Sequence, residues 1–239
     1  MEPGEIAGHG IGSPGDEPGF RFGGERRRMV EEQIVRRGVR DVRVLEAMER
    51  VPRHLFVDEE YEAEAYADRP LPTTAGQTIS QPYIVARMLE LLELEPAHRV
   101  LEVGTGSGYQ TALLARLAGD VHSIERVPAL AEGARARLAM LDVRNAFVHE
   151  GDGSLGWRAQ APYDRVLVAA AAPRVPEALQ AQLRERGVLV IPVGGPRFQQ
   201  LEVWRRLAHD RWEHRRHGEC RFVPLLGRDA WRGDRDTIE

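Results

Sequence analysis

The sequence contains no lysine, and all 33 of its basic residues are arginines. This absence excludes a P-loop nucleotide site, whose lysine holds the terminal phosphates, and a lysine Schiff base with a carbonyl substrate. The single cysteine, Cys220, excludes an internal disulfide and is typical of a reducing compartment. We therefore expect a cytoplasmic protein.

Long apolar runs and strong net charge are also missing. No stretch reaches the roughly 18 apolar residues of a membrane span, and no apolar segment follows a charged start at the N-terminus. We therefore expect neither a transmembrane helix nor a secretory signal. The formal net charge of −4 predicts no binding to nucleic acid or to an anionic membrane surface.

A possible set of metal ligands near the C-terminus does not have the right spacing. His214, His217 and Cys220 lie three residues apart on a predicted strand, so neighbouring members of the set face opposite sides. A zinc site needs convergent ligands, usually four. We expect no metal.

Composition divides the chain into three parts. Residues 1–24 are rich in glycine and proline, and such a segment buries too little apolar surface to order itself, so we expect a disordered extension. Residues 25–227 form one predicted domain, because a chain of this length can bury a sizeable core. Residues 228–239 are expected to be a frayed tail.

Within the domain, the hydrophobic pattern predicts helices and apolar strands in alternation. Two N-terminal helices and a loop over 57–76 precede this region. The expected helices are 25–38, 42–51, 81–94, 109–119, 128–141 and 176–187, and the expected strands are 99–104, 121–125, 145–151, 163–171 and 188–194. Strands that are apolar throughout and alternate with helices predict a doubly wound, mostly parallel α/β sheet of the Rossmann-like kind. The last segments, from 199 to 225, alternate apolar and polar residues and predict an antiparallel hairpin on the sheet edge.

A glycine-rich loop, LEVGTGSGY, follows the first of these strands and opens a helix. Gly104, Gly106 and Gly108 would let backbone N–H groups approach a ligand at the switch point of the sheet. The spacing differs from a dinucleotide fingerprint, because Tyr109 stands where the third glycine would be. A lone glycine loop is also a common tight turn, so other residues must decide its role.

Acidic residues at or near three strand ends favour a nucleoside that carries a cationic group. Glu102 precedes Gly104 by two positions, where it would repel a pyrophosphate and attract an ammonium group. Glu125 ends the second strand and could accept hydrogen bonds from both hydroxyls of a ribose. Asp152 follows the third strand and could accept from an adenine amino group. Together they predict S-adenosylmethionine rather than NAD.

Several stretches resemble one family when read in chain order. They are VPRHLFV (51–57), GQTISQPYIVARM (76–88), LEVGTGSGY (101–109), GDG (151–153), VAAAAP (168–173) and RFVPL (221–225). In this order they are similar to the protein-L-isoaspartate O-methyltransferases, a family of class I S-adenosylmethionine-dependent methyltransferases. The resemblance implies methyl transfer to the free α-carboxylate of L-isoaspartyl residues in damaged proteins and peptides, by an enzyme that we expect to be monomeric.

The resemblance also assigns residues. It implies that Ser80, in the TIS stretch, is the catalytic residue. It adds Thr78, Ile79, Thr105 and Gly153 to the cofactor site predicted above, and it suggests a substrate site that contains Thr78, Ser80, Ala170 and Arg221.

Plainer roles are open for three of these features. Ser80 could cap the helix that contains Pro82 in its first turn. The small residues of VAAAAP could serve helix–sheet packing, and Arg221 could be a solvated strand residue. Two other functions also remain open, a methyltransferase for a small molecule or a nucleic acid and a binding protein for the nucleoside without catalysis.

Overall fold

The computed structural model describes residues 22–208 and 211–232. The predicted disordered extension, residues 1–24, lies outside this part except for its last three positions. Helix α1 already begins at Gly23.

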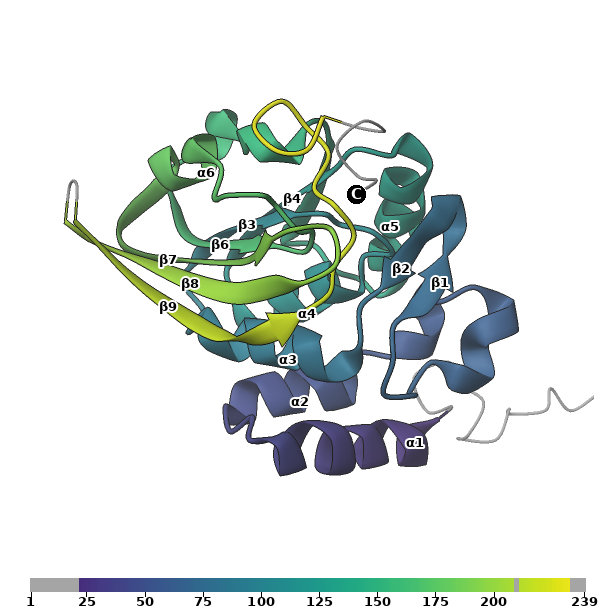
Figure 1. The fold of residues 1–239 in the computed structure, drawn as a ribbon. Coiled ribbons are helices and arrows are strands. Elements are labelled where there is room, and N and C mark those ends of the chain that lie inside the picture. The colour runs from purple at the N-terminus through teal and green to yellow at the C-terminus, as the bar shows by residue number, and fades with distance from the viewer. Residues whose placement is uncertain (1–21, 209–210, 233–239) are drawn as a thin grey trace, which may run out of the picture.

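A seven-stranded sheet forms the centre of the molecule, in the order β5-β4-β3-β6-β7-β8-β9 (Figure 1). Its strands are β3 (Arg99–Val103), β4 (Asp120–Glu125), β5 (Ala146–Glu150), β6 (Tyr163–Val168), β7 (Leu183–Gly194), β8 (Gln199–Ala208) and β9 (Arg211–Cys220). The first five in this spatial order are parallel, and β8 and β9 add an antiparallel hairpin to the edge. The predicted fold class is confirmed.

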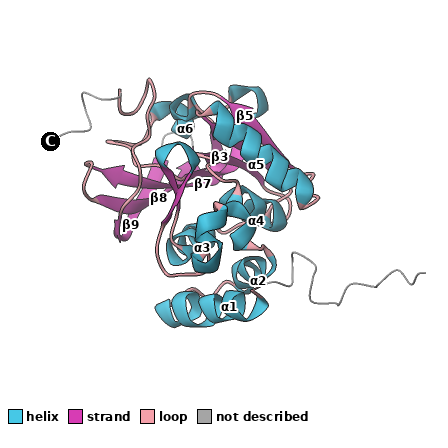
Figure 2. Cartoon of the chain, turned by 90° about the vertical axis from the view of Figure 1, so that its right-hand side faces the viewer, coloured by secondary structure: helices cyan, strands magenta, loops and turns pink. Residues whose placement is uncertain are grey.

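Helices cover both faces of the sheet, although unequally. They are α1 (Gly23–Arg28), α2 (Val42–Arg50), α3 (Pro82–Leu91), α4 (Tyr109–Leu117), α5 (Pro128–Met140) and α6 (Glu177–Ala181). Helical turns at Met29–Ile34 and Val35–Arg37 continue α1. Figure 2 shows α1 and α2 stacked outside α3 and α4, so the N-terminal helices form an additional layer. The opposite face packs against α6, the loop around Trp157 and the C-terminal segment.

The end of the first helical run and the start of α2 lie where the sequence predicts, whereas α1 begins at Gly23, two residues before the predicted start. Gly38, with φ +97°, ends the first helical run in the left-handed conformation that glycine adopts without strain. Asp41 caps α2, because its Oδ1 accepts hydrogen bonds from the backbone N–H groups of Arg43 at 2.9 Å and Val44 at 3.4 Å.

The predicted loop over 57–76 is wrong in part. It contains a helical turn at Glu59–Glu64 and strand β1 (Leu71–Thr73), which pairs with β2 (Gln77–Ile79) in a small antiparallel sheet. Strands of three residues are too short to show an alternating pattern, and Pro72 argues against a strand. Burial of Leu71 and Ile79 in the core holds the hairpin in place instead.

The predicted helix over 176–187 is also too long. It ends at Ala181, and β7 begins at Leu183, which pairs with Tyr163 of β6. The side chain of Leu183 is fully buried in the core on the α6 face, so strand pairing and burial outweigh local helix propensity there.

The C-terminal segment does not fray at residue 228 as predicted. The backbone N–H of Arg228 donates to Asp152 Oδ2 at 2.8 Å, and the indole N–H of Trp231 donates to the carbonyl of Ala171 at 3.1 Å. Residues 228–232 therefore pack against the domain. The rest of the predicted tail, 233–239, lies outside the described residues.

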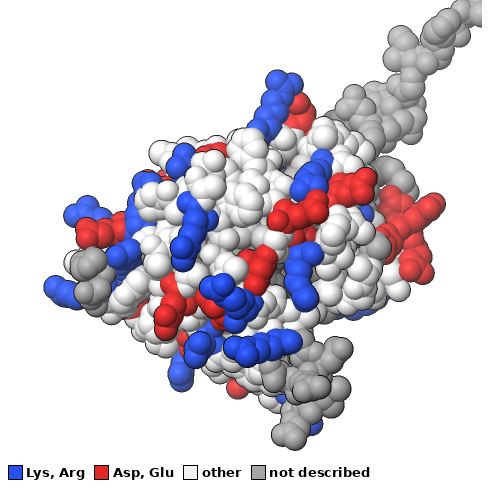
Figure 3. Space-filling model, turned by 90° about the horizontal axis from the view of Figure 1, so that it is seen from above, with Lys and Arg blue, Asp and Glu red and all other residues white. Residues whose placement is uncertain are grey.

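The surface carries charges of both signs, and basic and acidic side chains are interspersed on the face in Figure 3. Within the described part of the chain, no helix is both long enough and apolar enough to cross a membrane.

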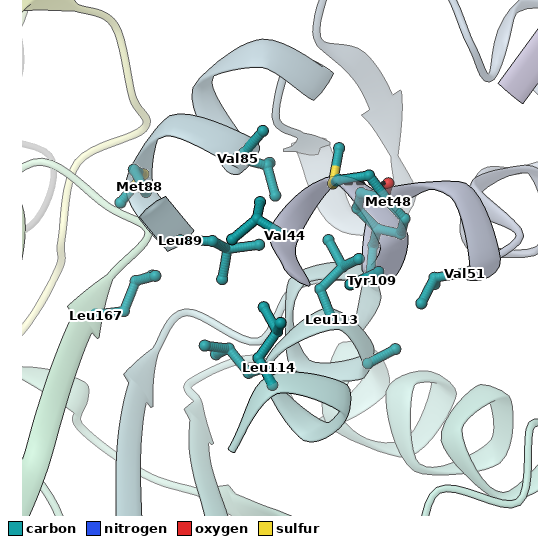
Figure 4. Packing of buried hydrophobic residues seen from close by; sticks show 14 of the residues in the cluster. Val44, Met48, Val51, Val85, Met88, Leu89, Tyr109, Leu113, Leu114 and Leu167 are labelled. Carbon is teal, nitrogen blue, oxygen red and sulfur yellow. Dashed lines mark hydrogen bonds between the residues drawn. The ribbon is translucent and has the colours of Figure 1, made fainter. Parts of the chain in front are cut away.

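The packing of α2 against α3 and α4 supports the start of α4, where the glycine loop ends. Val44 and Met48 of α2 point toward Leu89 of α3 and Leu113 of α4 (Figure 4). All four side chains are at most 1 % exposed. Burial of such a side chain contributes about 1.5–3 kcal/mol, so this contact provides a rigid base for the glycine loop.

Candidate active site

A pocket lies at the carboxyl edge of the sheet, where β3, β4 and β6 end. Its volume is about 930 Å³, open solvent at its mouth included. Nine of the predicted site residues line it: Thr78, Ile79, Ser80, Gly104, Thr105, Gly106, Glu125, Gly153 and Ala170. The tertiary structure thus brings together segments that are far apart in the sequence.

Four predicted site residues lie outside the pocket lining. They are Glu102, Gly108, Asp152 and Arg221. Arg221 is exposed just after β9, and its predicted role toward substrate stays a prediction.

The glycine loop makes the turn that its sequence predicts. Gly104 and Gly106 have φ angles of +93° and +55°, a region that glycine enters without strain. The N–H of Gly104 donates to the carbonyl of Ile124 at 2.9 Å, which ties the loop to the end of β4. Gly108 has a different task, since a Cβ at this position would lie 3.2 Å from the Cβ of Ala134 and push α4 away from α5.

Glu125 is held at the end of β4 by three backbone N–H groups. Its Oε1 accepts from Arg126 at 2.8 Å and Val127 at 2.9 Å, and its Oε2 accepts from Gly106 at 2.8 Å. A carboxylate has about four acceptor sites, so this one retains capacity for a ligand hydroxyl. The bonds fix the carboxylate in the pocket wall before any ligand arrives, as a ribose site would require.

Glu102 is fully buried beneath the glycine loop rather than in the pocket. Its carboxyl group accepts hydrogen bonds from the hydroxyls of Thr111 at 2.5 Å and Ser123 at 2.6 Å, and from the Gln110 amide at 3.2 Å. Burial raises the pKa of Glu102 to about 7, against the opposing effect of these hydrogen bonds. Through these hydrogen bonds Glu102 joins β3, β4 and α4. Because Glu102 does not line the pocket, its predicted contact with an ammonium group of the cofactor stays a prediction.

Asp152 also has protein partners where a ligand contact was predicted. Its Oδ1 accepts from the backbone N–H of Ser154 at 3.0 Å and from the Ser154 hydroxyl at 2.6 Å. Its Oδ2 accepts from the backbone N–H of Arg228, as described above. The neighbouring glycines explain the close packing, because a Cβ on Gly153 would overlap Val103 and one on Gly227 would overlap Asp152 and Ser154. Asp152 therefore anchors the C-terminal segment beside the pocket.

Ser80 lines the pocket and does not cap α3. The helix is preceded by Gln81, no side chain caps it, and the amide of Gln81 donates instead to Asp68 Oδ1 at 2.7 Å. The backbone of Ser80 is fixed from below, since Arg53 Nη2 donates to its carbonyl at 2.8 Å. Ser80 is thus held at the pocket wall next to the N-terminus of α3.

Arg53 is a residue that the sequence analysis did not single out. Its side chain is fully buried, its Nε donates to the carbonyl of Ala65 at 2.7 Å, and its guanidinium lies 4.9 Å from the ring centroid of Tyr109. Burial lowers the pKa of Arg53. Tyr109 lines the pocket and begins α4 directly after Gly108. The position of Tyr109 next to the glycine loop could have identified Tyr109 as a residue of the pocket wall.

The remaining walls of the pocket are largely apolar. The sequence analysis did not assign these residues to a site. For those in the C-terminal segment, the RFVPL stretch (221–225) was the one sequence feature that pointed to a role. The apolar residues are Val85, Val103, Ile124, Val127, Ala169, Val223, Pro224, Leu225 and Leu226. Gln77, Ser107, Gln110 and Arg126 complete the lining. These residues come from seven separate segments, and local sequence carries no sign that those segments meet.

The small residues of VAAAAP pack against the C-terminal segment and border the pocket, and their predicted role toward substrate stays a prediction. Ala170 lines the pocket, whereas Ala171 forms backbone hydrogen bonds with Val223 and Leu225 of the C-terminal segment, both at 2.8 Å. Small side chains therefore allow close backbone packing and leave space for a ligand at the same time.

The residues first considered as metal ligands have separate partners. His214 stacks on Trp204 with ring centroids 4.3 Å apart, and Cys220 Sγ lies 3.6 Å from the carbonyl of Gln199. In residues 22–208 and 211–232, no three His, Cys, Asp or Glu side chains are grouped so that they could hold a metal ion.

The fold and the pocket together define a class. A parallel sheet with a glycine loop after one strand and a fixed carboxylate at the end of the next is the arrangement of the class I S-adenosylmethionine-dependent methyltransferases. Residues 25–230 match the model of the protein-L-isoaspartate(D-aspartate) O-methyltransferase family, and the chain belongs to that family.

Individual relatives agree with this assignment. A protein-L-isoaspartate O-methyltransferase of Methanoregula boonei is 55 % identical over 207 residues, which cover 87 % of this chain and 95 % of the relative. One from Koribacter versatilis is 53 % identical over 216 residues, or 90 % and 96 % of the two chains.

Solved structures give the same result. A protein-L-isoaspartate O-methyltransferase aligns with a TM-score of 0.77 at 27 % identity, over 85 % of this chain and 67 % of the other. A Plasmodium falciparum protein of this kind, in complex with S-adenosyl-L-homocysteine, aligns with a TM-score of 0.72 at 25 % identity, over 85 % and 99 % of the two chains.

Proposed function

We propose that this protein transfers a methyl group from S-adenosylmethionine to the free α-carboxylate of L-isoaspartyl residues in damaged proteins and peptides. Family membership supports the reaction. The observation that carries it to this site is the meeting of Ser80, the glycine loop and Glu125 in one pocket. The first belongs to a substrate wall and the other two to a nucleoside site.

The residues that line the pocket fit the chemistry of the cofactor. The fixed carboxylate of Glu125 would bind a ribose hydroxyl, and Gly104 to Gly106 would lie against the amino-acid part. The apolar side chains of Ile124 and Val127 would contact the flat base. Thr78, Ile79, Thr105 and Gly153 line the same pocket and are proposed as further contacts.

When bound, the cofactor supplies an electrophilic methyl group on a sulfonium. The substrate α-carboxyl has an ordinary pKa of roughly 3.5, so it is ionised at neutral pH and no residue needs to remove a proton. The protein has to orient the carboxylate oxygen and to keep water away from it. Alignment of two reactants can contribute roughly 7–11 kcal/mol in favourable cases. Val85 and Leu225 form apolar walls that exclude water.

Ser80 is proposed to orient the substrate carboxylate. Its hydroxyl can donate a hydrogen bond, and it precedes the N-terminus of α3, whose partial positive charge favours an anion. The hydrogen bond from Arg53 to the Ser80 carbonyl holds the backbone of Ser80 in place. The backbone that carries the hydroxyl therefore need not become ordered when the substrate binds. Ala170, which lines the same pocket, would leave room for the peptide backbone.

A methylation assay with two peptides tests this function. The peptides are identical except for L-isoaspartyl or L-aspartyl at one position, and the protein is incubated with S-adenosylmethionine labelled in the methyl group. We expect label only in the isoaspartyl peptide, as a base-labile ester. Binding of the cofactor without label in either peptide would indicate a nucleoside-binding protein without catalysis, and label in both would indicate a less selective methyltransferase.

We further propose that the protein works in the cytoplasm and as a monomer. The single cysteine supports a reducing compartment. The residues proposed to bind cofactor and substrate meet within one chain, so the proposed reaction does not need a residue from a second copy. Light scattering coupled to size exclusion checks the mass of the particle, and a dimer that retains its mass at nanomolar concentration would contradict the second proposal.

A further inference from the structure

A second pocket, here called the basic pocket, lies among residues to which the reaction above gives no role. It is lined by Pro173, Arg174, Arg228, Asp229, Ala230 and Arg232 and has a volume of about 540 Å³, open solvent at its mouth included. Three arginines face one aspartate, so its formal charge is positive although that of the whole chain is negative.

The basic pocket adjoins the proposed active site, because two wall segments continue from one pocket into the other. Ala170 and Leu226 line the active-site pocket, and Pro173 and Arg228 line the basic pocket. An extended residue spans at most about 3.6 Å, so Ala170 and Pro173 lie within about 11 Å of each other, and Leu226 and Arg228 within about 7 Å.

The shared wall is held together by hydrogen bonds. The indole N–H of Trp231 donates to the carbonyl of Ala171 at 3.1 Å, and its backbone N–H donates to the carbonyl of Leu225 at 3.0 Å. The anchor of Arg228 to Asp152 fixes the far side of the segment. The backbone that carries Arg174 and Arg228 is therefore held in place beside the proposed substrate site.

Their guanidinium groups are available for a ligand. Arg174 and Arg228 are exposed, and Arg228 forms one exposed ion pair, with its Nε 3.7 Å from Asp229 Oδ1. A guanidinium has five N–H donors, so this pair leaves others on Arg228 for a ligand. Among the residues that the structure describes, Arg174 has no ion pair with a carboxylate. A planar guanidinium binds a carboxylate through two parallel hydrogen bonds.

We propose that the basic pocket binds the carboxylate side chain of an acidic residue two or three positions from the isoaspartyl residue of the substrate. This inference rests on the proposed function and adds a preference among its substrates. The mixed charges in Figure 3 favour a single carboxylate over a nucleic acid, whose backbone needs a broad basic surface. An extended peptide of two to three residues covers the distance between the pockets.

Peptides that differ at one flanking position test the proposal. Each carries one isoaspartyl residue, with Glu, Gln or Lys at the second or third position on either side, and kcat/KM is measured for methyl ester formation. We expect kcat/KM to be roughly three- to tenfold higher for Glu than for Gln on one side, and lower still for Lys. The preference should shrink in 0.5 M salt, where charges on the surface are screened.

The variants Arg174→Gln, Arg228→Gln and the double variant assign the preference to this pocket. Both side chains are exposed, and the backbone N–H that bonds Asp152 is retained in Arg228→Gln, so the fold should persist. Arg116→Gln, an exposed arginine on α4, is the matched control. The double variant should methylate the Gln peptide normally and lose the preference for Glu, whereas the control should keep it.

Four outcomes would overturn the inference. Equal rates for the Glu and Gln peptides, with isoaspartyl still preferred to aspartyl, would remove the inference and leave the proposed function intact. If the preference for Glu survives in the double variant, another part of the surface binds the acidic residue. If a single-stranded oligonucleotide inhibits at a far lower concentration than an acidic peptide of equal charge, the basic pocket binds a nucleic acid instead. Absence of methylation in every isoaspartyl peptide would remove the proposed function as well.

Discussion

The guanidinium of Arg53 donates a 2.8 Å hydrogen bond to the backbone carbonyl of Ser80. Arg53 is fully buried behind the pocket wall, and the same side chain also bonds the carbonyl of Ala65 and lies over Tyr109. One buried residue thus connects the strand end that presents the Ser80 hydroxyl with the start of the helix that follows the glycine loop.

Arg53→Met should therefore damage both stability and catalysis. The substitution leaves two buried carbonyls without donors, at about 1–3 kcal/mol each, so the free energy of unfolding in urea should fall by roughly 2–4 kcal/mol. At a temperature where the variant is still folded, kcat for an isoaspartyl peptide should fall at least tenfold. Arg50→Met, an exposed position on α2, should change neither quantity appreciably. Normal kcat in folded Arg53→Met would remove Arg53 as a positioning residue.

Ser80→Ala should reduce methyl transfer and spare cofactor binding. A hydrogen bond to a charged group contributes about 1.5–3 kcal/mol, so kcat/KM should fall roughly 10- to 150-fold. The dissociation constant of S-adenosylhomocysteine, measured by calorimetry, should stay within about twofold because Ser80 is assigned to the substrate side. Ser107→Ala, on the glycine-loop side of the pocket, is the matched comparison and should affect the cofactor more than the peptide. Wild-type kcat/KM in Ser80→Ala would exclude the proposed role.

Glu125→Gln should weaken cofactor binding. The amide keeps the shape of the side chain but replaces one acceptor oxygen with a donor, which faces either the N–H groups of Arg126 and Val127 or that of Gly106. We expect the dissociation constant of S-adenosylhomocysteine to rise roughly tenfold or more. Glu150→Gln, at the end of β5 and paired on the surface with Arg135, should leave it unchanged. An unaltered constant in Glu125→Gln would contradict the ribose contact.

Glu102 should make stability depend on pH. Burial raises its pKa to about 7 in the folded protein, against an ordinary value of 4.5, so the folded state holds this proton more tightly than the unfolded state. Its contribution to stability is fully present below about pH 4.5, is lost as pH rises toward 7, and stays lost above that. The total change is on the order of 3 kcal/mol.

Glu102→Gln tests this dependence because the amide mimics the protonated carboxyl. As pH rises from 5 to 8, the unfolding free energy of the wild type should fall relative to that of the variant, as measured by urea titration. Glu46→Gln, on the exposed face of α2, should show no such trend. The same variant examines the predicted ammonium contact: if Glu102 only joins the elements beneath the loop, the dissociation constant of S-adenosylhomocysteine at pH 8 stays within about threefold.

The parts of the fold that were predictable have strong local signals. Strands such as β3 and β6 are mostly apolar, and Asp41 and Gly38 mark helix ends by chemistry that acts within one turn. The predictions failed where tertiary contacts outweigh local preference. The β1–β2 hairpin is too short to be periodic, and Leu183 begins a strand inside a helical pattern because it pairs with Tyr163 and fills the core.

The residue types of the cofactor site came from the sequence by itself, because glycines at a strand end and a carboxylate at the next one reveal their chemistry at fixed spacing. The role of Ser80 in the TIS stretch came from the resemblance to the family. Which of the acids faces the ligand was decided only by the tertiary structure. Glu125 stands in the pocket wall, whereas Glu102 is turned beneath the loop and Asp152 is engaged by the C-terminal segment. The physical reason is that the direction of a strand side chain and the approach of a segment some 70 residues away depend on packing across the whole domain, and no local pattern records that packing.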